Sequence, residues 1–98
     1  MAKTWRLFLL ALENADIQRI QTLTTTRGFG YIGIAEKSES ENLLELPYLA
    51  ELWANPEVRW HIQDEITVIA AVPTPGGEHI FIFVRESNEW KLDIVGAA

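Results

Sequence analysis

The chain has 98 residues, no cysteine and a formal net charge of −6. This length, without a linker rich in Pro, Gly or Ser, predicts a single domain spanning residues 1–98. The absence of cysteine excludes disulfides, thiolate nucleophiles, iron–sulfur clusters and cysteine-based zinc sites. The basic residues are scattered singly and form no stripe that could follow a phosphate backbone, so we expect no nucleic-acid partner.

The N-terminal segment predicts an amphipathic helix. Four apolar residues recur there at helical spacing on one broad face: Trp5, Phe8, Leu9 and Leu12. The apolar run from Leu7 to Leu12 is shorter than the apolar region of a secretory signal peptide. No stretch approaches the ~20 apolar residues of a membrane span. We therefore expect no membrane partner and favour a cytoplasmic location.

A second short helix and a third, later helix are expected before the sheet. Asn14 suits the end of the first helix, and Asp16 suits the N-cap of a second helix. The threonines at 24–26 and the glycines at 28–33 favour a loop or short strand. Proline suits a first helical turn, so the next helix is expected to begin near Pro47 and to end near Asn55.

The second half of the chain predicts an antiparallel sheet. Apolar residues alternate from Glu57 to Val72, which indicates one long, half-buried strand. A turn at 73–77 leads to a strand over 79–85 that is apolar on both faces and hence central. The last strand begins at Trp90, which we expect to be buried against the first helix. The predicted fold class is α+β, with N-terminal helices packed on a curved antiparallel β-sheet.

The familiar cofactor and metal motifs lack their structural context. Gly28, Gly30 and Gly33 spell G-x-G-x-x-G, but neither a strand before the motif nor a helix after it is expected, so we predict no dinucleotide site. His61 and His79 lie on different strands without a metal-binding spacing. We therefore expect no cofactor and no metal.

Asp64 is the strongest candidate among the polar residues for a functional role. The two-residue period places it on the apolar face between Ile62 and Ile66. A carboxylate buried there could act as a general base beside a hydrophobic pocket, with His61 and Tyr31 as further catalytic candidates. The alternative, which we favour, is a β-bulge at 63–65 that turns Asp64 to solvent.

Four aromatic residues are candidates for the lining of a ligand pocket, because their rings supply apolar area and their polar tips can orient a ligand: Tyr31, Tyr48, Trp53 and Trp60. Aromatic residues at core periodicity more often belong simply to the core.

The central strand also predicts a homodimer through the sheet, because only one of its apolar faces can contact the helices. The expected contact face carries Arg59, His61, Phe81, Phe83 and Arg85. The opposite phase of the same strand would instead present Ile80, Ile82 and Val84. A third alternative is that the segment 27–42 covers the sheet and no partner is needed.

The order of these segments resembles the nuclear-transport-factor-2-like, or cystatin-like, superfamily. The resemblance rests on the helix break from Ala11 to Ile17, on the passage from Leu23 into a glycine-containing loop, and on the closing strands Phe81 to Glu86 and Glu89 to Ile94. It implies a bent sheet wrapped around the first helix as a cone, with a pocket at the open end and dimers through the outer sheet face. Enzymatic members, similar to ketosteroid isomerase and scytalone dehydratase, use pocket Asp, His or Tyr residues.

Three functions remain open from the sequence. The first is a non-catalytic domain that binds a small apolar ligand or another protein, because no titratable cluster is arranged for a named reaction. The second is a small isomerase, cyclase or dehydratase with Asp64 as its base. The third is a module whose acidic surface docks a basic partner.

Overall fold

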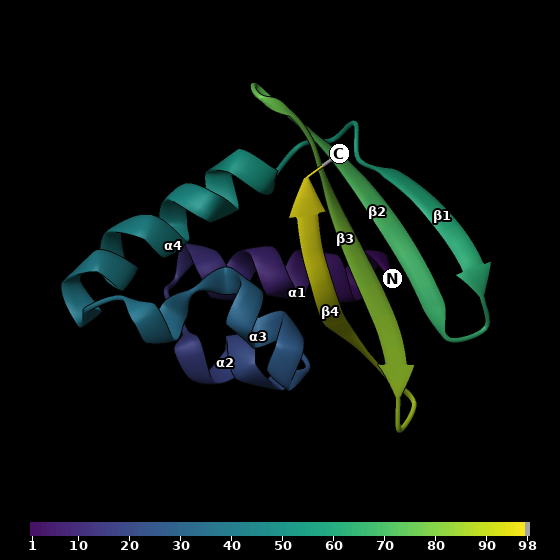
Figure 1. The fold of residues 1–98 in the computed structure, drawn as a ribbon, viewed down its shortest axis with the longest axis horizontal. Helices are drawn as coiled ribbons and strands as arrows, with labels where there is room; N and C mark the ends of the chain where they lie inside the picture. The colour runs from purple at the N-terminus through teal and green to yellow at the C-terminus, as the bar shows by residue number, and fades with distance from the viewer. Residues whose placement is uncertain (98) are drawn as a thin grey trace.

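The computed structural model describes residues 1–97 as helices packed on a four-stranded, unclosed antiparallel sheet (Figure 1). The α+β fold class is thereby confirmed. The helical elements are α1 (Ala2–Glu13), α2 (Ile17–Thr22), α3 (Thr26–Ile32), the 3₁₀ turn η1 (Ile34–Glu36) and α4 (Glu39–Trp53). The strands are β1 (Arg59–Asp64), β2 (Thr67–Thr74), β3 (Gly77–Glu86) and β4 (Glu89–Ala97). None of the helices within residues 1–97 has the length and hydropathy needed to cross a bilayer.

The first two helices form as the sequence predicts. Asn14 is the C-cap of α1, where its backbone N–H donates to the last carbonyls of the helix. The Asp16 side chain caps α2 by accepting a hydrogen bond from the backbone N–H of Arg19 at 3.1 Å. Such a cap satisfies one of the N–H groups that a helix N-terminus leaves without a partner.

The glycine-containing segment is a helix, so the prediction of a loop or short strand over 28–33 was wrong. The Thr25 hydroxyl caps α3 by accepting a hydrogen bond from the N–H of Gly28 at 3.0 Å, and Gly33 ends the helix with a φ of +80°. Gly28 is buried against β4, where an added Cβ would lie 2.0 Å from the carbonyl oxygen of Leu92. Gly28 therefore serves close packing, and Gly33 serves helix termination.

Helix α4 begins at Glu39 and not near Pro47, which corrects the expected boundary. Ser38 and Glu41 form a capping box, in which each side chain accepts a hydrogen bond from the other residue's backbone N–H. Proline inside a helix costs about 3 kcal/mol. The cap and the burial of Leu46, Ala50 and Trp53 on one face offset this cost.

The single long strand predicted between Glu57 and Val72 is a hairpin of β1 and β2. The register between these strands shifts between Ile62 and Asp64, at the position where the sequence favoured a break. The sheet order is β1-β2-β3-β4, so β3 is a central strand, as predicted. The sequence predicted three strands and not four, because the alternation of apolar residues continues across the hairpin turn between β1 and β2.

The core lies between α1, α4 and the inner face of the sheet. Trp5 of α1 meets Phe81 of β3 edge-on, with ring centroids 5.0 Å apart. Phe8 stacks on Trp53 of α4 at 6.3 Å. The indole Nε1 of Trp53 also donates a hydrogen bond to Nδ1 of His79 at 2.8 Å. Aromatic contacts of this kind connect both long helices to β3.

Two glycine variants of α3 test the packing of this helix against β4. Gly28→Ala should lower the free energy of unfolding by about 2 kcal/mol, because its Cβ has no space beside the Leu92 carbonyl. Gly30→Ala is the matched control: nothing lies within 4 Å of its added Cβ, so the helix should gain about 0.5–1 kcal/mol. Chemical denaturation of both variants measures the difference, and equal effects would contradict the close approach of α3 to β4.

Candidate functional site

An apolar hollow opens on the inner side of the sheet beside the β1–β2 turn. Its cavity volume is about 330 Å³, at the lower end of the range found for ligand pockets. Both hairpin strands, β4 and the start of α1 contribute to its lining: Met1, Trp60, Ile62, Asp64, Glu65, Val68 and Trp90.

The walls of the hollow contain large apolar side chains that the fold leaves in water. Ile62 is 75% exposed and Trp60 is 37% exposed. Trp60 is held in place by the aromatic core, since its ring centroid lies 6.0 Å from that of Trp5 and 6.3 Å from that of Phe83. The hollow is thus a preformed apolar surface backed by a rigid core.

Asp64, the last residue of β1, lies exposed at the rim of the hollow, next to the hairpin turn. Its carboxylate accepts a hydrogen bond from the backbone N–H of Ile66 at 2.9 Å, which stabilises the turn. This arrangement and the adjacent register shift agree with the favoured reading, in which a bulge turns Asp64 to solvent. Glu65 is the other carboxylate of the rim.

The remaining catalytic candidates do not share this hollow. Tyr31 lies on α3 with 52% of its surface exposed, and His61 lies on the opposite face of β1 from Trp60. The three candidates therefore lie on different surfaces because helix and strand geometry direct them apart.

Of the four aromatic pocket candidates, only Trp60 lines the hollow. Trp53 is buried in the core, whereas Tyr48 lies exposed on α4 and Tyr31 on α3. Sequence reasoning missed Trp90, which is half-buried beside the hollow, and Val68. The sequence predicted Trp90 to be in the buried core. Trp90 instead lies near the start of β4, where its half-buried side chain forms part of the wall of the hollow.

On the outer face of the sheet, β3 presents Ile80, Ile82 and Val84, and not Phe81 and Phe83 as expected. Phe81 and Phe83 point inward and are fully buried, so they are not on the outer face. Arg85 follows them in the same phase. Arg59 and His61 do lie on the outer face, opposite Ala71 and Ile69, where Arg59 forms an ion pair with Glu78. This face carries half-buried apolar residues from the three other strands: Ile69, Ala71, Ile80, Ile82, Val84 and Ile94.

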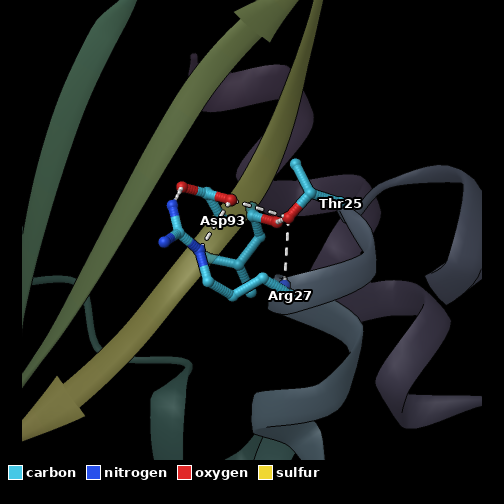
Figure 2. A network of polar contacts seen from close by, with 5 residues as sticks. Thr25, Arg27 and Asp93 are labelled. Carbon is cyan, nitrogen blue, oxygen red and sulfur yellow. Dashed lines mark hydrogen bonds and ion pairs between the residues drawn. The ribbon is translucent and has the colours of Figure 1, made fainter.

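A polar cluster joins α3 to β4 (Figure 2). The Arg27 guanidinium donates to both oxygens of Asp93, at 3.3 Å from Nε and 2.5 Å from Nη2. The Thr25 hydroxyl donates to Asp93 Oδ1 at 2.8 Å. These hydrogen bonds, those from Arg27 foremost, hold the pKa of Asp93 below its ordinary value although burial opposes the shift.

The chemistry of this cluster is that of a structural clamp. Both oxygens of Asp93 accept hydrogen bonds, and Arg27 is engaged through two of its nitrogens. A carboxylate held in this way is a poor general base because its lone pairs are occupied. Across residues 1–97, no group of three or more His, Cys, Asp or Glu side chains is placed to hold a metal ion.

No protein-family model, no curated protein and no solved structure matches the chain.

The clamp makes a prediction about pH. The pKa of Asp93 is lowered by folding, so its stabilising effect is present at neutral pH and is lost as the pH falls through the folded-state pKa. Asp93→Asn should lower the free energy of unfolding by about 2 kcal/mol at pH 7, and the deficit should shrink below about pH 4. Asp16→Asn is the control, because asparagine caps a helix as well as aspartate does. A deficit that did not change with pH would contradict the ion pair.

Proposed function

We propose that this chain is a non-catalytic binding domain whose apolar hollow receives an apolar group of a ligand. The observation that carries the proposal is the hollow itself, about 330 Å³ in volume, with Trp60 and Trp90 in its walls. An occupant would remove from water the exposed surface of Ile62 and Trp60, which favours binding by roughly 25 cal/mol per Å² of apolar area before the costs of association. The nuclear-transport-factor-2-like resemblance is part of this proposal, because it also implies a pocket at the open end of the sheet.

Titration with neutral indole tests the hollow directly. The indole N–H resonances of Trp60 and Trp90 should shift on titration, whereas that of Trp53, which is committed to His79, should stay in place. Ile62→Thr should weaken binding about fivefold because it removes apolar surface, an effect of roughly 1 kcal/mol.

The matched control for this titration is Ile66→Thr. Ile66 is also an exposed isoleucine of the hairpin, at 56%, but it does not line the hollow. Equal effects of the two variants, or shifts confined to Trp53, would contradict the proposed site.

The second part of the proposal is a homodimer through the outer sheet face. This face carries aliphatic side chains from neighbouring strands, with Ile82 paired to Ile69 on one side and to Ile94 on the other. The helices pack against the inner face and beside β4 (Figure 1). In the described part of the chain, residues 1–97, the segment 27–42 therefore does not cover the outer face. A second copy would cover an apolar surface of the kind that single domains seldom expose.

Sedimentation equilibrium measures the oligomeric state. We expect twice the mass of the 11.1 kDa chain at micromolar concentration, and a single-chain mass for Ile82→Lys. Leu44→Lys is the control, since Leu44 is 77% exposed on α4, away from the sheet. A single-chain mass for the unmodified protein, unchanged on dilution, would rule the dimer out.

A further inference from the structure

The two edges of the sheet differ in what satisfies their backbone groups. At the β4 edge, Leu92 donates to the carbonyl of Leu23 and accepts from the N–H of Thr25, each at 2.9 Å. The β1 edge has no such cover within residues 1–97, and its six residues are all exposed. Figure 1 shows β1 at the side of the sheet farthest from α2 and α3.

The alternation of hydrogen-bonded residues along the strands shows which backbone N–H and C=O groups of β1 point away from the sheet. Arg85 donates to the carbonyl of Ile66 at 2.9 Å, which makes this pair a hydrogen-bonded one in the β2–β3 ladder. Alternation then directs the backbone of Ile69 and Ala71 toward β1, where they pair with His61 and Arg59. The N–H and C=O groups of the intervening residues, Trp60 and Ile62, point away from the sheet.

These same two residues form a wall of the apolar hollow. Trp60 and Ile62 therefore offer open backbone donors and acceptors together with exposed apolar side chains. Edge strands that must stay unpaired usually carry Lys, Pro or an inward charge. Residues 59–63 contain no Lys or Pro and no inward-facing charge, and Asp64 lies beyond the register shift, exposed at the rim of the hollow.

Charge along this edge is negative. The polar members of the hollow's rim are Asp64 and Glu65. The cation of Arg59 is already paired with Glu78 on the outer face. An occupant carrying Lys or Arg beside an apolar residue would match both the apolar wall and the acidic rim.

We propose that the β1 edge binds an extended basic-apolar peptide segment, which adds a strand to the sheet and places an apolar side chain in the hollow. This inference rests on the proposed function and names the class of ligand that supplies the apolar group. The backbone of Trp60 and Ile62 provides affinity through ladder hydrogen bonds, while the hollow and its carboxylates select the side chains. Alternate side chains of the peptide face the hollow because strand side chains alternate.

A second copy of the chain fits this edge less well. A two-fold antiparallel pairing must match residues that face the same side of the sheet. In the register that pairs Trp60 with Ile62, the acidic residues that flank the strand, Glu57 before β1 and Asp64 with Glu65 at its end, are brought together from the two copies. Like charges close to one another across a strand pair are destabilising, so the acidic flanks of β1 disfavour this self-pairing.

The probe is a synthetic array of acetylated, amidated octapeptides. Each has threonine at its odd positions, all combinations of Val, Ile, Phe and Lys at positions 2, 4 and 6, and lysine at position 8. The tightest members should bind with micromolar affinity and shift the Trp60 indole N–H resonance. N-methylation of the backbone amides that face β1 should weaken binding at least about tenfold, and methylation in the other phase less than about threefold.

Two variants at one position separate backbone pairing from side-chain contact. Ile62→Pro removes an edge N–H that makes no bond to β2, so the fold should tolerate it. Ile62→Thr removes the same apolar side chain but keeps the N–H. The proline variant should bind the best peptide at least about tenfold more weakly than the threonine variant, with both retaining the four tryptophan resonances of the folded chain.

The outcomes distinguish this inference from the proposed function. If indole binds in the hollow but no peptide of the array does, or if both methylation phases act equally, the edge inference is overturned and the hollow stands. If indole also fails to bind, the proposed function falls with it. A dimer that Ile62→Pro dissociates and Ile82→Lys does not would assign the edge to a second copy and overturn the peptide.

Discussion

The burial of Trp5 between α1 and the sheet is the interaction on which the rest of the structure depends. Its ring touches Phe8 on its own helix, Phe81 and Phe83 on β3, and Trp60 on β1. One side chain thus fixes the position of the helix over the central strand and reaches the edge strand. Truncation of a large aromatic core residue typically costs about 3–5 kcal/mol, and at Trp5 that cost would fall on the contacts among α1, β3 and β1.

The packing of the helices also explains why one edge of the sheet is covered and the other is open. Gly28 lets α3 approach β4, and the ion pair of Arg27 with Asp93 holds the two elements together. The helical half of the chain is thereby committed to the β4 side. No residue of β1 is buried, and the apolar side chains of Trp60 and Ile62 are left at the hollow. The open edge is therefore a consequence of where the helices must pack.

Sequence reasoning succeeded where a signal was local and periodic. The stripe of α1, the Asp16 cap and the central position of β3 follow from residue spacing alone. It failed at α3, because threonine and glycine have low helix propensity, and the Thr25 cap and contact with β4 override that preference. The hollow could be predicted only in part: Trp60 and Asp64 were named, but Trp90 was assigned to the buried core, because residue spacing shows which face a side chain is on and not where the core ends along the strand.

Hydrogen exchange of the β1 amides tests whether the backbone N–H groups of Trp60 and Ile62 point away from the sheet into water. We expect the amides of Arg59 and His61 to exchange at least about tenfold more slowly than those of Trp60 and Ile62, because only the first pair donates to β2. Uniform protection of all four amides at every protein concentration would show that the edge is already covered and that no strand can be added there.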